Sequence, residues 1–179
     1  MRRLSGAALV GAPVLVLSLV LPPTSVGAAA GSSGEWQVRQ STSLATPAAG
    51  WRTRMLARVN AVRSLAGAAP VVYCPSLQAS AQAYASQLAR SNTFGHIGPD
   101  GRGPGERMTA AGYRWTLAGE NLAGGQRTVY EVMQGWRGSA SHLATMSEAG
   151  FTHVGFGYAT AAVSTYGRYW VQHYAAGRC

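Results

Sequence analysis

A five-residue stretch near the end of the chain, Val154-Gly155-Phe156-Gly157-Tyr158, has glycine at every second position. Successive side chains of a β-strand point to opposite faces, so the three large side chains share one face and the other face carries none. A face without side chains lets a packed helix approach the sheet closely. The stretch therefore predicts a strand with a helix packed against its glycine face.

Further strands are expected on either side of this stretch. Residues 169–174 are rich in aromatic and β-branched residues, which is typical of a strand. Residues 160–168 have the length of a wide hairpin connection between the two strands. Residues 117–122 form a shorter extended segment, which carries Glu120.

Two long helices are expected before the strands. One begins at residue 52 and ends before Gly67, and the other begins at Pro75, a residue that suits a first turn. Their apolar residues recur every three or four positions, which is the helical period. These buried stripes are Met55, Val59, Val62 and Ala66, and Leu77, Ala81, Tyr84, Ala85 and Leu88. Arg54, Arg58 and Arg63 lie outside the first stripe and are expected to face the solvent.

A third helix is expected to begin at Thr128, because Thr128 and Glu131 form a capping box and apolar residues follow on one face. Shorter helices are expected over 106–111 and, with Ser139 as its cap, over 139–146. Helices followed by strands in one chain of this size predict an α+β fold built in layers.

The first thirty residues have the features of a secretory signal peptide. Arg2 and Arg3 form a basic start, residues 7–21 are apolar apart from Ser18, and small residues follow at 28–30. The apolar run is too short for a transmembrane helix, which needs about 20 residues. We therefore expect a secreted protein with no stable membrane anchor after cleavage, a flexible leader over 31–50, and one folded domain over 51–179.

Cys74 and Cys179 are the two cysteines of the chain. Outside the cytoplasm a pair of cysteines usually forms a disulfide. The alternative is a catalytic thiol, which needs a histidine partner, and neither cysteine has one nearby in the sequence. We expect a disulfide that joins residue 179 to the start of the second helix.

The net charge of +9 comes entirely from arginine, and the arginines are scattered along the sequence. A groove for nucleic acid would need clustered cations interleaved with stacking aromatic residues. We therefore expect no nucleic-acid partner, and only a weak attraction to anionic cell-surface polymers.

His96, Glu120 and His142 are the residues most able to carry chemistry. Two neutral imidazoles can bind a divalent metal, and a carboxylate can ligate it or orient an imidazole. The same groups could polarise a water molecule, or they could be ordinary hydrogen-bonded residues that knit the fold together. His153 and His173 lie in expected strands, and both are interpreted as surface or hydrogen-bonded sheet residues.

A serine hydrolase is a further interpretation of the same stretch. Ser139 or Ser141 could act as nucleophile, with His142 as base and Glu120 as the carboxylate. The sequence has no nucleophile elbow of the Gly-x-Ser-x-Gly kind. Serines at the start of a helix are explained more simply as caps.

Eight short motifs occur in a fixed order between residues 55 and 175. They are Val59-Asn60-Ala61-Val62-Arg63, Phe94-Gly95-His96 with Pro99-Asp100-Gly101, Ala111-Gly112-Tyr113, Gly119-Glu120-Asn121-Leu122-Ala123, Gly135-Trp136, Ser139-x-x-His142, Phe151-Thr152-x-Val154-Gly155-x-Gly157, and Tyr169-Trp170-Val171-Gln172. Together they resemble the CAP superfamily of SCP-like domains, and most of all its secreted bacterial branch.

The resemblance implies a three-layer α-β-α sandwich with a central antiparallel sheet and a large cleft. In the family, two histidines and two acids line this cleft, and divalent cations are found there. His96, Glu120 and His142 match three of these positions, and Ser139 stands where the second acid is usual. The loss of one carboxylate implies a weaker or differently built metal site, with zinc favoured by the imidazole ligands.

Members of the family have no common reaction. Lipid and sterol binding, protease-like activity and cell-wall contact are all assigned to them. We expect a non-enzymatic secreted domain whose cleft binds a small ligand, a lipid, a cell-surface polymer or a divalent metal. The alternative is an extracellular hydrolase that acts on a peptide or cell-wall substrate through the same cleft.

Overall fold

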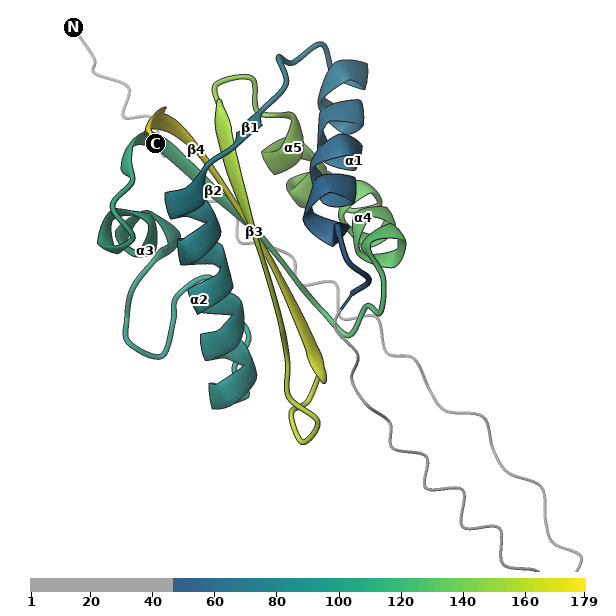
Figure 1. Cartoon of the computed structure of the whole chain (residues 1–179), viewed down its shortest axis with the longest axis vertical. Coiled ribbons are helices and arrows are strands. Elements are labelled where there is room, and N and C mark those ends of the chain that lie inside the picture. The colour runs from purple at the N-terminus through teal and green to yellow at the C-terminus, as the bar shows by residue number, and fades with distance from the viewer. Residues whose placement is uncertain (1–46) are drawn as a thin grey trace, which may run out of the picture. The chain divides into compact units, whose positions relative to one another are not determined.

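The structure is a computed structural model that describes residues 47–179 (Figure 1). The expected signal peptide and residues 31–46 of the expected leader lie outside the described residues. The elements are α1 (Trp51–Leu65), β1 (Val72–Tyr73), α2 (Pro75–Ser91), α3 (Pro104–Ala110), β2 (Arg114–Gly124), α4 (Val129–Arg137), α5 (Ala140–Ser147), β3 (His153–Thr160) and β4 (Arg168–Arg178). Within residues 47–179, no helix is long and apolar enough to cross a membrane.

The four strands form one sheet in the order β1-β3-β4-β2. The long strands β2, β3 and β4 pair antiparallel, as expected, and β3 and β4 form the predicted hairpin. The two-residue strand β1 was not expected, and it pairs parallel to β3. Since β2 lies at the end of this order, one of its edges has β4 as neighbour, and the other has no neighbouring strand within residues 47–179.

Helices cover both faces of the sheet (Figure 1). Helices α2 and α3 lie on one face, and α1, α4 and α5 lie on the other. This arrangement confirms the predicted three-layer α-β-α sandwich. All the predicted apolar residues of α2 are buried, and so are those of α1 except Ala66, which is exposed.

The glycine face of β3 is packed directly against the backbone of α2. A Cβ atom at Gly155 would lie 2.2 Å from the carbonyl carbon of Leu77, and one at Gly157 would lie 2.0 Å from the carbonyl oxygen of Ala81. Real Cβ atoms do not come so close to other atoms, so the two glycines set the distance between α2 and the sheet. The predicted close approach of a helix is confirmed.

The prediction that Arg63 faces the solvent is wrong. Its side chain is fully buried and donates hydrogen bonds to four backbone carbonyls. Nε bonds Ala69 at 2.7 Å, Nη1 bonds Met146 and Glu148 at 2.9 Å each, and Nη2 bonds Phe151 at 3.0 Å. The guanidinium therefore joins α1 to the segment before β1 and to the segment between α5 and β3.

The predicted disulfide is confirmed. Cys74 and Cys179 are bonded, with their Cα atoms 5.8 Å apart and a sequence separation of 105. Cys74 immediately precedes α2, so the bond ties the end of β4 to the start of the helix that packs on β3.

The capping box of α4 differs in one bond from the prediction. Thr128 accepts a hydrogen bond from the backbone N–H of Glu131 at 3.1 Å, as expected. The Glu131 carboxylate accepts from the backbone N–H of Arg127 at 2.7 Å, one residue before the cap. The box still gives Glu131 a structural role at the start of α4.

Candidate functional site

Glu120 is the centre of a buried polar cluster on β2. Its Oε1 atom lies 2.7 Å from Nδ1 of His96. Its Oε2 atom accepts from Nη2 of Arg107 and lies next to Nε2 of His173, both at 2.8 Å. Both carboxylate oxygens are therefore engaged, and the carboxylate is almost inaccessible to solvent.

The fold brings the members of this cluster together from distant parts of the chain. Antiparallel pairing of β2 with β4 sets Glu120 directly opposite His173. Helix α3 supplies Arg107, whose guanidinium lies 3.4 Å from the ring centre of Tyr84 on α2. Arg107 also donates to the backbone carbonyl of His96 at 3.0 Å, and this bond holds the loop that follows α2.

These contacts determine the charge of Glu120. Burial by itself raises the pKa of the carboxyl group. Hydrogen bonds from His173 and His96, together with the electrostatic contributions of His173 and of the Arg107 guanidinium, outweigh burial and lower the pKa of Glu120 to about 2. Glu120 is therefore ionised at neutral pH, and its negative charge is neutralised locally.

Two members of the cluster, Arg107 and His173, were not among the predicted site residues. His173 was interpreted as a surface or hydrogen-bonded sheet residue, and it is fully buried with its Nδ1 atom lacking a partner among the described residues. The sequence offered one signal, a lone histidine that alternates with Val171 and Tyr169 in a buried strand. Arg107 gave none, because it is one of many scattered arginines.

His142 lies on α5 and contacts Ser139 instead of Glu120. Its Nδ1 atom is 2.8 Å from Oγ of Ser139, and its backbone carbonyl accepts from the side-chain amide of Asn121 at 3.1 Å. Burial lowers the pKa of His142, and the nearby charge of His96 lowers it further. The imidazole is thus neutral at neutral pH.

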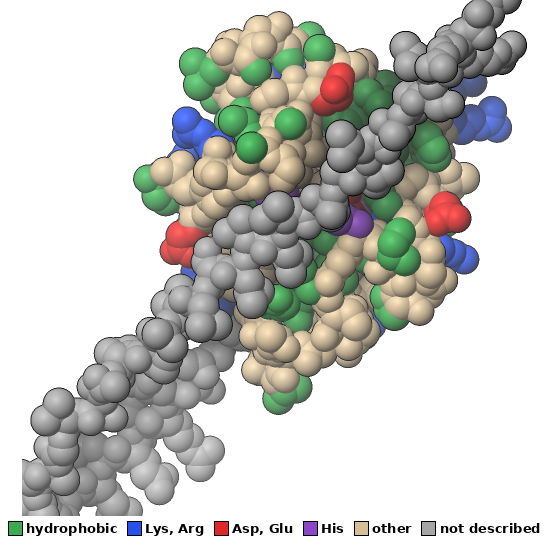
Figure 2. All heavy atoms as spheres, turned by 180° about the vertical axis from the view of Figure 1, so that it is seen from behind, with side chains coloured by type: hydrophobic (Ala, Val, Ile, Leu, Met, Phe, Trp, Pro, Cys, Tyr) green, Lys and Arg blue, Asp and Glu red, His purple; other side chains and the backbone are tan. Residues whose placement is uncertain are grey.

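The segments that carry His96 and His142 are held on opposite faces of the sheet by adjacent residues of the edge strand β2. His96 belongs to the α2 and α3 side through its bond to Glu120, and His142 belongs to the α5 side through Asn121. The His96 side chain is 59% exposed. Figure 2, which shows the side of the molecule hidden in Figure 1, has histidine side chains (purple) visible at its surface.

These residues do not fit the metal site that the resemblance implied. A closed zinc site has four protein ligands, and a catalytic one has three. Within residues 47–179, no group of three or more histidine, cysteine or acidic side chains is arranged to hold a metal. The Glu120 carboxylate is already bound to a guanidinium, whose charge also opposes a cation. No step of the function proposed below depends on a metal.

The residues of the hydrolase interpretation are only partly assembled. Ser139 stands at the predicted cap position of α5, but its hydroxyl makes no bond to the helix backbone in the described part of the chain. The hydroxyl contacts His142 instead, so the predicted cap is right in position and wrong in its bond. Glu120 orients His96 and not His142, so the third member of a triad is missing among the described residues.

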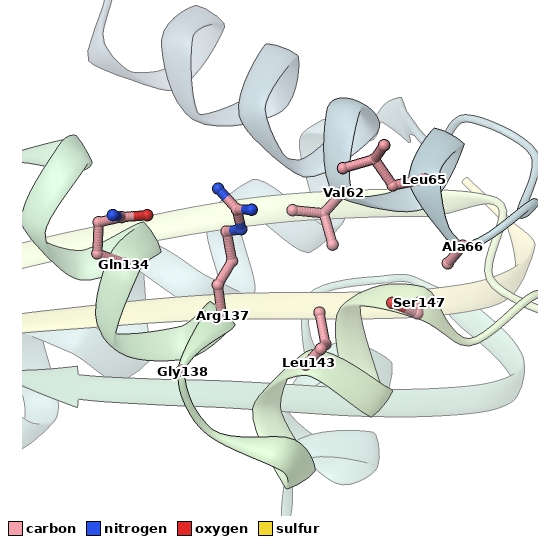
Figure 3. A pocket seen from close by; sticks show the side chains of 8 residues that line it. All are labelled: Val62, Leu65, Ala66, Gln134, Arg137, Gly138, Leu143 and Ser147. Atoms are coloured by element: carbon pink, nitrogen blue, oxygen red, sulfur yellow. The ribbon is translucent and has the colours of Figure 1, made fainter.

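A groove of about 510 Å³ lies between α1, α4 and α5 (Figure 3). Its lining residues are Val62, Leu65, Ala66, Gln134, Arg137, Gly138, Leu143 and Ser147. Leu65 is 83% exposed and Leu143 is 37% exposed, so the groove has apolar walls open to solvent. None of the predicted site residues is among those lining it, and the expected His/Glu-lined cleft is not this groove.

One cation lies on this groove. In Figure 3 the guanidinium of Arg137 extends from α4 toward α1, across the opening of the groove. Among the described residues, Arg137 has no hydrogen bond or ion pair. An adjoining hollow of about 80 Å³ shares Arg137 and adds Arg58. No carboxylate lines either space within residues 47–179, so both present positive charge beside apolar surface.

Comparison with known proteins identifies relatives of this chain. Residues 56–174 match the model of the cysteine-rich secretory protein family. The chain is 30% identical over 133 residues to the uncharacterized protein YkwD of Bacillus subtilis (strain 168). The match covers 74% of this chain and 50% of YkwD, so the chain spans half the length of this curated relative.

Solved structures share the fold. An extracellular SCP-domain protein from Bacillus anthracis has a TM-score of 0.61 and 22% identity, covering 69% of this chain and 39% of that protein. An outer surface protein from Borrelia burgdorferi has a TM-score of 0.63 and 19% identity, covering 71% of this chain and 92% of that protein. The order of the motifs, the layers of the fold and the match to the family model all indicate the same family. The chain therefore belongs to the cysteine-rich secretory protein family, the CAP superfamily.

Proposed function

We propose that this protein is an extracellular, non-enzymatic binding domain, and that its ligand is an amphipathic anion held in the groove between α1, α4 and α5. The observation that carries the proposal is the combination of apolar walls with an unpaired cation in one groove. The volume of about 510 Å³ is in the range of sites that bind drug-sized molecules, about 300–1,000 Å³.

The walls of the groove favour an apolar chain. Val62, Leu65 and Leu143 present side chains from two helices toward the same space (Figure 3). Leu65 is largely exposed in the free domain, so a bound alkyl chain would remove its surface from water. Burial of apolar surface contributes about 25 cal/mol per Å², which is the main driving force for such a ligand.

The cation favours a negatively charged head group. Arg137 has five N–H donors in a fixed plane, which match a carboxylate or a phosphate in two parallel hydrogen bonds. The net charge of +9 adds a general attraction for anions. An amphiphile with one acidic head, such as a fatty acid or a lipid phosphate, combines both features.

The polar cluster around Glu120 supports a binding role over an enzymatic one. A general acid or base needs a pKa near the working pH. The carboxyl group of Glu120 has a pKa of about 2 and three hydrogen-bond partners, so it is a structural anion and a poor proton acceptor. Its contacts tie the loop that carries His96 to the sheet.

Lauric acid tests this proposal, with dodecanol as an uncharged ligand of the same chain length. We expect saturable binding of lauric acid to the domain of residues 31–179 in isothermal titration calorimetry, and weaker binding of dodecanol. Arg137→Gln should weaken lauric acid binding about ten- to hundredfold, because a hydrogen bond to a charged group contributes about 1.5–3 kcal/mol. The matched control is Arg127→Gln, an exposed arginine outside the groove.

A second pair of variants tests the apolar wall. Leu65→Asp places a charge in the groove. The matched control Val163→Asp places a charge at a side chain that is 99% exposed and does not line the groove. We expect Leu65→Asp to abolish lauric acid binding and Val163→Asp to leave it unchanged. Equal affinities of both variants for lauric acid, or no saturable binding by the parent domain, would contradict the proposal.

The hydrolase is kept as a second candidate because Ser139 and His142 are in contact at 2.8 Å. His142 is neutral at neutral pH, as a general base must be. A hydroxyl activated in this way attacks an ester or amide carbonyl. The test is covalent labelling by a fluorophosphonate. Ser139→Ala should abolish the labelling, and the matched control Ser141→Ala should retain it. Absence of labelling in the parent domain would remove this candidate.

A further inference from the structure

The outer edge of β2 is a long row of backbone groups, and no strand of the described part of the chain lies beside it. The sheet order places β2 at one end, and the strand runs for 11 residues from Arg114 to Gly124. Across residues 47–179, no backbone group outside β4 pairs with the stretch from residue 117 to residue 124. An unpaired edge of this kind presents N–H and C=O groups that can pair with another extended chain.

Two hydrogen bonds show which backbone groups of β2 face outward. The carbonyl of Leu122 accepts from Nε1 of Trp136 on α4 at 3.0 Å, so this carbonyl points away from β4. The N–H of Gly125, three residues further on, donates to the carbonyl of Arg168 in β4 at 3.0 Å. The two observations agree with the strict alternation of inward and outward residues in an antiparallel pair.

The same alternation gives the direction of the backbone N–H and C=O groups at the centre of β2. The register is continuous from Leu117 to Gly124, because the irregularity lies between residues 115 and 117. Ala118 and Glu120, at even positions like Leu122, therefore turn their N–H and C=O groups outward. At the Leu122 end the edge is closed by the indole of Trp136.

The outward N–H and C=O groups of Ala118 and Glu120 lie between the segment that carries His96 and the segment that carries His142. The Glu120 side chain holds His96 on one face of the sheet, and Asn121 holds the His142 backbone on the other. Since these contacts are made to adjacent residues of one edge strand, they form two walls with the edge between them. We therefore infer that the occupant of the edge is a single extended chain, because a second copy would have to bring its own two walls against these.

Exposed side chains at the start of β2 indicate what the occupant carries. Trp115 is 43% exposed and Leu117 is 38% exposed, and both favour apolar side chains in a neighbour. Arg114 and Arg178 face each other across β2 and β4, and within the described part of the chain neither is in an ion pair. Like charges directly opposite one another are unfavourable, and an acidic residue of a partner would relieve the repulsion.

We propose that the outer edge of β2 binds an extended polypeptide segment as an added strand, with β-branched residues along the edge and an acidic residue near Arg114. Alternating N–H and C=O groups at strand spacing are matched by another peptide backbone. A sugar or a lipid has no such repeat. The proposal does not depend on the groove between α1, α4 and α5, because no residue of that groove takes part.

The probe is the peptide acetyl-Asp-Val-Thr-Val-Thr-Val-amide, added to the isotope-labelled domain of residues 31–179. Amide hydrogen exchange is followed by NMR. In the free domain, the amides of Ala118 and Glu120 should exchange faster than those of Gly119 and Asn121, which pair with β4. The peptide should slow Ala118 and Glu120 about tenfold or more and leave the other two unchanged.

Two N-methylated versions of the probe separate strand addition from other binding. In one version the first, third and fifth residues are N-methylated, and in the other the second, fourth and sixth. A chain bound along one edge uses the N–H groups of one set only. We therefore expect one version to lose the effect and the other to keep it. Equal effects of both versions would overturn the proposal.

Ala118→Pro tests the edge from the side of the protein. Proline removes the outward N–H of residue 118, which makes no bond to β4, so the sheet should remain intact. Peptide protection of Glu120 should then disappear, and Ala118→Val, which keeps the N–H, should retain it. Slow exchange of Ala118 and Glu120 in the free domain would contradict the proposal. So would protection that grows with protein concentration in the absence of peptide, because it would indicate pairing between two copies.

Discussion

Replacement of Glu120 by glutamine tests the buried cluster at the centre of the candidate site. The carboxyl group has a pKa of 4.5 in an unfolded chain and about 2 in the folded domain. This difference corresponds to about 3 kcal/mol of stability from the ionised form. Because the folded pKa is the lower one, the contribution is complete above pH 4.5 and is lost as the pH falls toward 2.

Two effects are expected for Glu120→Gln. At neutral pH the variant should be about 3–5 kcal/mol less stable, because the buried guanidinium of Arg107 loses its carboxylate. Between pH 4.5 and 2 the parent domain should lose about 3 kcal/mol more than the variant, since glutamine does not titrate there. Urea unfolding of the domain of residues 31–179 at a series of pH values measures both effects.

Glu131→Gln is the matched control for this experiment. Its carboxylate accepts one backbone N–H at the start of α4 and is exposed, so the change should cost less than about 1 kcal/mol. It should leave the loss of stability below pH 4.5 as large as in the parent. If Glu120→Gln and Glu131→Gln gave the same dependence on pH, the reasoning about the cluster would be refuted.

Three further predictions concern the fold and the metal. Arg63→Met leaves two buried and two partly buried carbonyls without this donor and should lower the free energy of unfolding by about 3–5 kcal/mol. The matched control is Arg54→Met, because the Arg54 side chain bonds exposed carbonyls just before α1; it should change the free energy of unfolding by less than about 0.5 kcal/mol. Similar urea midpoints for the two variants would contradict this prediction. Replacing Cys74 and Cys179 together by alanine opens a loop with a sequence separation of 105 and should cost about 4 kcal/mol, whereas a midpoint within experimental error of the parent would show that the bond adds nothing. Zinc or a chelator should leave the thermal midpoint unchanged, and a zinc-dependent rise worth about 2.7 kcal/mol at 100 times the dissociation constant would restore the metal site predicted from the sequence.

The sequence predicted those features that depend on local patterns. The stripe of α2 is confirmed because a helix that packs on a sheet must repeat its apolar residues with the helical period. Gly155 and Gly157 predicted the close packing of a helix because the lack of side chains is visible in the sequence itself. The disulfide was predicted because the chain has two cysteines and its first thirty residues have the features expected of a secretory signal peptide.

Other features depend on contacts that no local pattern records. His173 joins Glu120 only because β2 and β4 pair in one register, and a shift by one residue would turn His173 to the other face. Arg63 is buried because carbonyls from the segment before β1 and from the distant stretch 146–151 converge on it. The groove is built from residues of three helices. Val62 and Ala66 belong to the stripe that was predicted to be buried, and the other lining residues look like ordinary surface in the sequence.

The most direct test of the binding function is to locate an amphipathic anion on the domain. Spin-labelled stearic acid, titrated into the methyl-labelled domain of residues 31–179, broadens the NMR signals of methyl groups close to the bound chain. The account predicts saturable broadening of Val62, Leu65 and Leu143, which line the groove, and none at Val163 in the loop between β3 and β4. Broadening that is absent, or that is as strong at Val163 as at Leu65, would contradict the account.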